Sequence, residues 1–296
     1  MDIFPVVVIG AGPAGLAVAM QLSRQGHKPL VLERSRVGGL LWNANLVENY
    51  PGFYPGISGP ELVARFQEQA KGLGVSIAFE DARWTGFEDD LFRIETDKRE
   101  LAAQFLVAAA GTKARTLPED LLRPELKERV FSEVYPLLGC SGKKVIIIGG
   151  GDAAFDYALN LAKENQVIIL TRGEEIKALP LLYKRAQGQT AITCHLDAEV
   201  LSLADDENGG LQIGVLHQGE QVDLLGDFLI TAIGRVPDTS YAARSIMNEI
   251  DRLQNEHKLY LIGDLKNGLF RQTAIAVGDG IRAAMEISQY LSKESL

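Results

Sequence analysis

A glycine-turn pattern that occurs twice constrains the fold of this chain more than any other feature. Residues 4–34 have the sequence FPVVVIGAGPAGLAVAMQLSRQGHKPLVLER: an apolar strand, a tight glycine turn, a helix with apolar residues at helical spacing, and a second apolar strand. Residues 143–172 repeat much of this order as KKVIIIGGGDAAFDYALNLAKENQVIILTR. Each copy predicts a βαβ unit, so we expect an α/β fold with two Rossmann-like dinucleotide-binding domains.

Both turns carry the small residues of a dinucleotide fingerprint. The first glycine makes the turn, the second lets a pyrophosphate approach the backbone, and the third position lets the helix pack close to the strand. The following helix then faces the phosphates with its unpaired N–H groups. A single glycine turn between a strand and a helix can be required by the backbone conformation alone. Two copies, each between a strand and a helix, favour two nucleotide sites. The fingerprint positions are Gly10, Gly12 and Gly15 in the first copy and Gly149, Gly151 and Ala154 in the second.

The two copies differ at the end of their second strand. Glu33 ends that strand in the first copy, where a carboxylate can accept hydrogen bonds from the two hydroxyl groups of a ribose. The second copy has Thr171 and Arg172 there, which suits the 2′-phosphate of NADPH. Glu174 and Glu175 follow closely and weaken that preference, so NADPH and NADH both remain open.

The order of segments predicts an inserted domain. Strands close on small residues at Ala110-Gly111 and again at Gly234, which suits crossings between two domains. The chain then returns with a strand, Gly263-Asp264, and a helix expected to begin near Arg271 or Gln272. We therefore expect residues 1–113 and 238–296 to form a discontinuous first domain, with residues 114–237 inserted as the second.

Composition and charge exclude several classes of function. The net charge of −9, with no basic stripe, argues against nucleic acid as a partner. The two cysteines and four histidines have no ligand spacing, so no metal site is expected. No apolar run is long enough to cross a membrane, and the N-terminal residues lack the pattern of a signal peptide, so a cytoplasmic protein without membrane association is expected.

Six separated motifs resemble those of the thioredoxin-reductase-like family of FAD-dependent pyridine-nucleotide oxidoreductases. Their order and spacing match essentially from end to end. The motifs are VIGAGPAG at 8–15, GGLLWNANLVENYPG at 38–52, AAAGT at 108–112, IGGGDAA at 148–154, AIGRVPDT at 232–239 and GDLKNGLFRQTA at 263–274.

This resemblance implies an FAD domain, an inserted domain for NADPH or NADH, and a homodimer. Because the chain lacks the dithiol of the disulfide-reducing members, we expect the chemistry to lie on the flavin, with no catalytic side chain of the protein. The residues it assigns to FAD are Gly10, Gly12, Pro13, Ala14, Gly15, Glu33, Arg34, Gly38, Gly39, Leu40, Asn49, Ala82, Ala110, Gly111, Gly263, Asp264, Arg271, Gln272 and Thr273. The residues it assigns to NAD(P)H are Gly149, Gly151, Asp152, Ala153, Ala154, Thr171, Arg172, Lys177 and Gly234.

Two features depart from the family pattern. Disulfide-reducing members carry a C-x-x-C before the second glycine turn, and counting back from that turn places it at 132–135, which here reads SEVY. Cys140 lies closer to the strand, and the other cysteine, Cys194, lies in the distal part of the nucleotide domain. The basic cluster that holds the 2′-phosphate in the family is also reduced here to Arg172 and Lys177.

Because the C-x-x-C is missing, three hypotheses for the function of this chain stand beside one another. The leading hypothesis is an enzyme that exchanges a hydride with NAD(P)H and passes electrons from FAD to a carrier such as ferredoxin or flavodoxin, although an acidic chain is an indifferent partner for acidic ferredoxins. One alternative is a flavin-binding electron-transfer or regulatory module with impaired nicotinamide use. Another is a thioredoxin-reductase-like disulfide reductase that uses an atypical route, with a thioredoxin-like carrier as its partner.

Overall fold

The computed structural model describes residues 2–207 and 209–294, which divide into two compact units. Unit 1 contains Met1–Trp42, Val47–Lys113 and Val236–Leu296, and unit 2 contains Asn43–Leu46 and Ala114–Arg235. Two of the unit boundaries lie within strands β7 (Thr112–Ala114) and β16 (Arg235–Pro237), which pair with each other, and two more flank Asn43–Leu46. The sequence patterns do not anticipate the grouping of Asn43–Leu46 with unit 2.

Within the described residues, unit 1 is built on a seven-stranded sheet with the order β3-β2-β1-β6-β5-β4, and β17 also pairs with β6. Strands β3, β2, β1, β6 and β17 run parallel, whereas β4 and β5 form an antiparallel hairpin beside β6. The carboxyl ends of the parallel strands therefore meet at one edge. The bounds are β1 Asp2–Ile9, β2 Leu30–Leu32, β3 Ser76–Ala78, β4 Ala82–Glu88, β5 Leu91–Thr96, β6 Glu100–Ala108 and β17 Leu259–Leu261.

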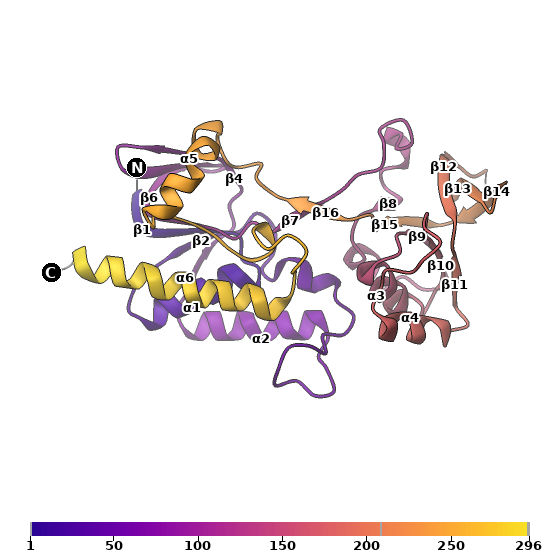
Figure 1. The fold of residues 1–296 in the computed structure, drawn as a ribbon, viewed down its shortest axis with the longest axis horizontal. Coiled ribbons are helices and arrows are strands. Elements are labelled where there is room, and N and C mark those ends of the chain that lie inside the picture. The colour runs from indigo at the N-terminus through magenta and orange to yellow at the C-terminus, as the bar shows by residue number, and fades with distance from the viewer. Residues whose placement is uncertain (1, 208, 295–296) are drawn as a thin grey trace. The chain divides into compact units, whose positions relative to one another are not determined.

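Three helices of unit 1 lie together in Figure 1: α1 (Pro13–Arg24), α2 (Gly59–Gly72) and α6 (Thr273–Glu294). Helix α6 begins at Thr273, one or two residues later than the sequence predicts. It packs closely on α1, because a side chain at Gly280 would collide with the carbonyl oxygen of Ala14. The remaining helical segments are α5 (Arg244–Asn255) and the 3₁₀ turns η1 (Gly39–Asn43) and η4 (Gly263–Leu265).

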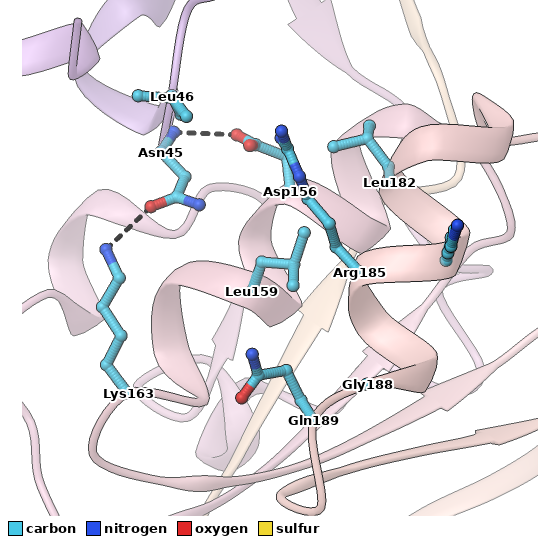
Figure 2. A pocket seen from close by; sticks show the side chains of 10 residues that line it. Asn45, Leu46, Asp156, Leu159, Lys163, Leu182, Arg185, Gly188 and Gln189 are labelled. Carbon is cyan, nitrogen blue, oxygen red and sulfur yellow. Dashed lines mark hydrogen bonds between the residues drawn. The ribbon is translucent and has the colours of Figure 1, made fainter. Parts of the chain in front are cut away.

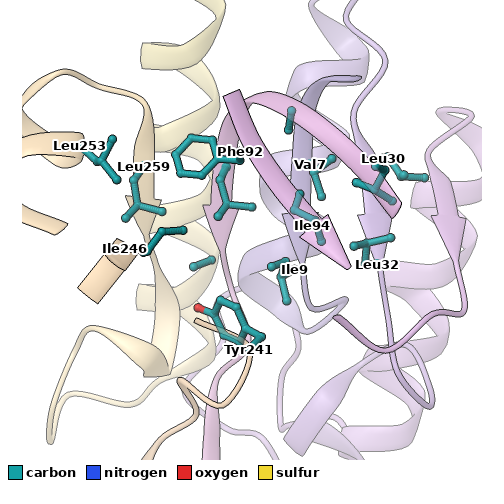
Figure 3. Close-up of a cluster of buried hydrophobic side chains, with 14 of the residues drawn as sticks. Val7, Ile9, Leu30, Leu32, Phe92, Ile94, Tyr241, Ile246, Leu253 and Leu259 are labelled. Atoms are coloured by element: carbon teal, nitrogen blue, oxygen red, sulfur yellow. The ribbon is translucent and has the colours of Figure 1, made fainter. Parts of the chain in front are cut away.

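A buried cluster on one face of the unit 1 sheet joins both ends of the chain, as Figure 3 shows. Val7 and Ile9 of β1 contribute from the N-terminal part, and Ile246 and Leu253 of α5 from the C-terminal part. Burying such side chains contributes about 1.5–3 kcal/mol each. The core of unit 1 is therefore complete only after the chain has returned from unit 2.

Unit 2 contains a parallel five-stranded sheet with the order β11-β10-β9-β15-β8 and an antiparallel three-stranded sheet with the order β12-β13-β14, both counted over the described residues. The bounds of its strands are β8 Val130–Phe131, β9 Lys144–Ile148, β10 Gln166–Leu170, β11 Ile192–His195, β12 Ala198–Asp205, β13 Leu211–His217, β14 Glu220–Gly226 and β15 Phe228–Thr231. The helical segments are α3 (Asp152–Leu161), α4 (Pro180–Gln187), η2 (Pro124–Leu126) and η3 (Tyr135–Leu137).

Alternation along β9 explains how unit 2 covers both faces of its parallel sheet. Val145 and Ile147 pack in a cluster with residues of α3 and α4. Ile146 packs in a second cluster, with residues of β12 and β13. Successive strand residues face opposite sides, so an uninterrupted apolar strand is buried on both. The predicted α/β architecture with two Rossmann-like domains is thereby confirmed.

Residues 2–207 and 209–294 contain neither a candidate membrane span nor a candidate metal cluster. No helix in this part is long and apolar enough to cross a membrane. No group of three or more histidine, cysteine, aspartate or glutamate side chains is arranged to hold a metal ion.

Candidate functional site

The first glycine turn follows β1 at the edge where the parallel strands of unit 1 end. The backbone of Gly10 has a φ of +103°, and a Cβ there would lie 2.5 Å from the carbonyl oxygen of Ala109. A Cβ at Gly15 would collide with the carbonyl oxygen of Gly10. At Gly12, by contrast, a Cβ would meet nothing within 4 Å. Two glycines are therefore required by the packing of the turn, and the third leaves open space beside the backbone.

The start of α1 offers backbone donors at this open space. Gly12 is the N-cap residue, and no side chain caps the helix. Pro13 takes the first helical position, where a missing N–H costs nothing, and Ala14 is buried beside it. An uncapped helix start with open space beside it suits a bound phosphate.

Glu33 is buried at the end of β2, with only 8% of its surface exposed. One carboxylate oxygen accepts a hydrogen bond from the backbone N–H of Ala11 at 2.9 Å, and the other accepts from the N–H of Ser35, also at 2.9 Å. Glu33 is therefore not a charge in solvent at the end of a strand. Its carboxylate is buried and connects the end of β2 to the first glycine turn. The next residue, Arg34, forms an ion pair with Asp238 at 3.1 Å.

Segments far apart in the sequence meet at the same edge. A Cβ at Gly263 would lie 2.9 Å from the Cβ of Ala14, so the η4 turn lies against the start of α1. The N–H of Gly263 donates to Asp279 of α6 at 3.0 Å, which fixes the turn, and Asp264 follows half-buried. Ala110 and Gly111 follow the end of β6, whose Ala108 pairs with Ile9 of β1.

The segment that begins at Gly38 lies beside the first glycine turn. The N–H of Gly38 donates to the carbonyl oxygen of Ala11 at 2.8 Å, and a Cβ at Gly39 would lie 3.4 Å from the Cα of Gly12. Leu40 continues η1, half-buried. These contacts place the Gly38-Gly39-Leu40 segment at the edge where we expect FAD.

Asn49 and Gln272 meet although 223 residues separate them, with Asn49 Nδ2 donating to Gln272 Oε1 at 2.7 Å. Gln272 lies between the half-buried Arg271 and Thr273, the first residue of α6. The structure thus brings together two residues that the sequence assigns separately to the flavin. Ala82 lies elsewhere, on β4, where it pairs with Thr96 and packs half-buried against the core.

The second glycine turn follows β9 in the same manner. Gly149 has a φ of +146°, and a Cβ there would collide with the carbonyl oxygen of Ala232. Gly151 is the N-cap of α3, without a side-chain cap, and a Cβ there would meet nothing within 4 Å. The helix continues with Asp152, the exposed Ala153 and the fully buried Ala154. Unit 2 therefore repeats the open helix start of unit 1.

The residues at the end of β10 surround this turn. Thr171 is buried, and its Oγ1 would lie 2.6 Å from a Cβ at Gly150. Arg172 is exposed, as are Glu174 and Glu175. The exposed Lys177 follows in the same loop, and its backbone N–H donates to the carbonyl oxygen of Gly150 at 3.0 Å.

Gly234 lies at the end of unit 2, after β15, with a φ of +107°. Its carbonyl oxygen accepts from the N–H of Arg115 at 3.0 Å. It thus adjoins the place where the chain crosses between the units, as the sequence predicts for a small residue.

Both cysteines of the sequence lie in the described part, and both are free thiols. Cys140 precedes the amino end of β9, whereas Gly149 follows its carboxyl end. Cys194 lies near the carboxyl end of β11, which β10 separates from β9, and burial raises the pKa of its thiol. Both side chains pack against the cluster that α3 and α4 share with the sheet, but the two residues lie toward opposite ends of its strands.

The segment 132–135, where the family pattern places a dithiol, is held by polar contacts instead. The N–H of Tyr135 donates to Asn43 Oδ1 at 3.0 Å, and Asn43 Nδ2 donates to Glu133 at 3.2 Å. Glu133 also pairs with Arg235 at 3.6 Å. Our sequence reasoning missed Asn43 and Glu133, because no local pattern signals that residues 90 positions apart will pair.

The sequence matches the family model for pyridine nucleotide-disulphide oxidoreductases over residues 4–280, and the chain belongs to this family. It is 28% identical to NADPH-dependent thioredoxin reductase 3 of Arabidopsis thaliana, over 98% of this chain and 59% of that protein. It is likewise 28% identical to thioredoxin reductase of Mycolicibacterium smegmatis, over 98% of this chain and 97% of that protein. Among solved structures, thioredoxin reductase of Lactococcus lactis superposes with a TM-score of 0.87 at 28% identity, covering 98% of this chain and 99% of that one.

These findings confirm the predicted class: the chain is a thioredoxin-reductase-like oxidoreductase that uses FAD and NAD(P)H. All three relatives described here are thioredoxin reductases. They therefore support the thioredoxin-reductase-like alternative better than the leading hypothesis of a ferredoxin or flavodoxin reductase.

Proposed function

We propose that this chain transfers electrons from NAD(P)H through FAD to a separate redox carrier protein, without a dithiol of its own. The observation that carries the proposal is the position of the cysteines. Cys140 and Cys194 are free thiols that lie toward opposite ends of the unit 2 sheet, and polar contacts occupy the segment 132–135. No sulfur pair is available in unit 2 to attack and then resolve a substrate disulfide.

FAD belongs, in this proposal, at the carboxyl edge of the unit 1 sheet. Gly12 and the start of α1 would hold its pyrophosphate, and Glu33 would lie at its ribose. Asn49 and Gln272 would lie at the isoalloxazine ring, with the positive end of α6 beside it. When bound, FAD accepts a hydride and releases two electrons.

NAD(P)H belongs at the corresponding edge of unit 2. Gly151 and the start of α3 would hold its pyrophosphate, since both turns leave the same space open. This open space argues against the alternative of a module that no longer uses nicotinamide. Arg172 would select NADPH by contacting its 2′-phosphate, while Glu174 and Glu175 in the same exposed loop would favour NADH.

A thioredoxin-like protein is the acceptor that the relatives favour. The balanced reaction is NAD(P)H, one proton and a carrier disulfide giving NAD(P)⁺ and a carrier dithiol. A ferredoxin or flavodoxin is the second candidate, in which two carriers each take one electron and one proton is released. A homodimer, which the family resemblance implies, is part of the same proposal.

Anaerobic reduction of the flavin tests the proposal. The purified protein is mixed with NADPH or NADH, bleaching of the flavin band is followed, and the reduced protein is then mixed with thioredoxin, ferredoxin, flavodoxin or ferricyanide. We expect bleaching with at least one nicotinamide, and reoxidation by one carrier that persists in the Cys140→Ser variant. Absence of bleaching with both nicotinamides would refute reductase activity, and loss of carrier reduction in Cys140→Ser would refute a route without protein sulfur.

A further inference from the structure

Unit 2 carries a hollow of about 440 Å³ that the proposed nucleotide site does not use. Figure 2 shows helices α3 and α4 on two sides and the segment Asn43–Leu46 on another. Two hydrogen bonds tie Asn45 to the other side of the hollow: Asp156 accepts from the N–H of Asn45 at 2.8 Å, and Lys163 Nζ donates to Asn45 Oδ1 at 2.8 Å.

The charge around this hollow is opposite to that of the chain as a whole. Lys163, Lys184 and Arg185 line it, whereas the chain carries a net charge of −9. Asp156 is the one carboxylate among the lining residues, and it is largely buried with its oxygens turned to backbone N–H groups. Lys163 donates to two amide oxygens, those of Asn45 and Asn160, and its charge also lowers the pKa of Asp156, so one carboxylate stands against three cations around the hollow.

Apolar side chains lie beside these cations. Leu159 and Leu182 line the hollow itself. Leu179 and Leu181, at the start of α4, are 55% and 50% exposed. Because Leu181 lies three residues before Lys184, the two side chains share one face of the helix. A small molecule bound in the hollow would leave this exposed face of α4 in contact with water. The surface of a protein partner would cover the hollow and the face of α4 together.

We infer that α4 and the adjoining hollow form the docking surface for the carrier protein, and that the carrier presents acidic side chains around an apolar centre. This inference rests on the proposed function, because it assigns a surface to the acceptor proposed there. Interfaces of this kind combine apolar anchors with charges that steer association. The local basic charge also removes the objection that an acidic enzyme is a poor partner for an acidic carrier.

Substitutions that leave the flavin and nucleotide edges intact can test this surface. Leu181→Ser and Lys184→Glu change two exposed positions of α4, and Leu201→Ser and Lys127→Glu are matched controls at exposed positions of β12 and the η2 region. Oxidised thioredoxin is the main acceptor, with ferredoxin and flavodoxin measured in parallel. Ferricyanide reduction measures turnover that needs no carrier.

We expect Leu181→Ser and Lys184→Glu each to raise the KM for the carrier at least tenfold, with unchanged ferricyanide turnover and near-normal values in both controls. Added salt should raise the wild-type KM, and this dependence should be weaker in Lys184→Glu. A normal KM in both α4 variants, or an equal rise in the controls, would overturn the surface while leaving the proposed function intact. If the wild type reduces ferricyanide but no carrier, both the carrier and its docking surface are refuted.

Discussion

Single glycines in the two turns serve two separable purposes. Gly10 and Gly15 are required for packing, because a side chain at either would meet the backbone. Gly12 has an ordinary φ of −73°, and a Cβ there would meet nothing within 4 Å. Nothing in the protein itself therefore demands glycine at position 12, and the same holds at Gly151. A bound pyrophosphate close to the backbone would supply the missing reason.

An alanine at position 12 should weaken the binding of FAD alone, and an alanine at position 151 should weaken the binding of NAD(P)H alone. Gly12→Ala should fold normally but bind FAD at least roughly tenfold more weakly, a loss of about 1.4 kcal/mol, because its methyl group occupies the space of the phosphate. Gly151→Ala should retain FAD and raise the KM for NAD(P)H by a similar factor. Flavin content after dialysis and steady-state kinetics would measure the two effects. Wild-type behaviour of both variants would contradict the proposed sites.

Helix α3 both starts the proposed NAD(P)H site and holds the Asn43–Leu46 segment through Asp156. Burial raises the pKa of this carboxyl group to about 6, although hydrogen bonds from Asn45 and Leu46 lower it. Between pH 4 and pH 6 the folded protein keeps a proton that the unfolded chain has already released. The free energy of unfolding therefore falls as the pH rises through this window.

Asp156→Asn should remove that pH dependence, because an amide does not titrate, and its one oxygen can still accept from the N–H of Asn45. Relative to the variant, the wild type should lose about 2–3 kcal/mol of stability between pH 4 and pH 7. Urea unfolding of both proteins at several pH values would measure this difference. If the free energies of unfolding of the wild type and the variant change in parallel from pH 4 to pH 7, Asp156 has the same pKa in the folded protein as in the unfolded chain. That result would contradict the prediction.

At the scale of the whole molecule, each unit has its own sheet, its own core and its own nucleotide turn. A ligand that binds only the folded state stabilises the unit that holds it. FAD and NADP⁺ should therefore protect different parts of the same chain.

Hydrogen exchange with mass spectrometry can measure this protection unit by unit. FAD added to the flavin-free protein should slow exchange in β1 and α1, and NADP⁺ should slow it in β9 and α3. At a ligand concentration about 100 times Kd, each should stabilise its unit by about 2.7 kcal/mol. At the same ligand concentration, Gly151→Ala should lower only the protection by NADP⁺, to about 1.4 kcal/mol. Protection of both units by either ligand alone would contradict independent sites.

The sequence predicted those parts of the fold that short-range patterns control. Buried parallel strands are apolar along their whole length, and the turns after them need small residues, so β1 and α1 and their counterparts β9 and α3 could be placed in advance. The antiparallel strands β12–β14 were not predicted, because their alternating residues resemble many surface segments. Glu33 was placed correctly at the strand end, but its burial and its bond to Ala11 were not foreseen.

The sequence alone determined the family, the two glycine turns and the absence of a C-x-x-C, because each is a matter of residue type and spacing along the chain. The tertiary structure decided which distant groups meet: Asn49 with Gln272, Tyr135 with Asn43, and Lys163, which follows α3, with the cations of α4 around one hollow. The physical reason is that such contacts form between side chains that only packing of the sheet and helices brings within hydrogen-bonding distance, and no local periodicity records them.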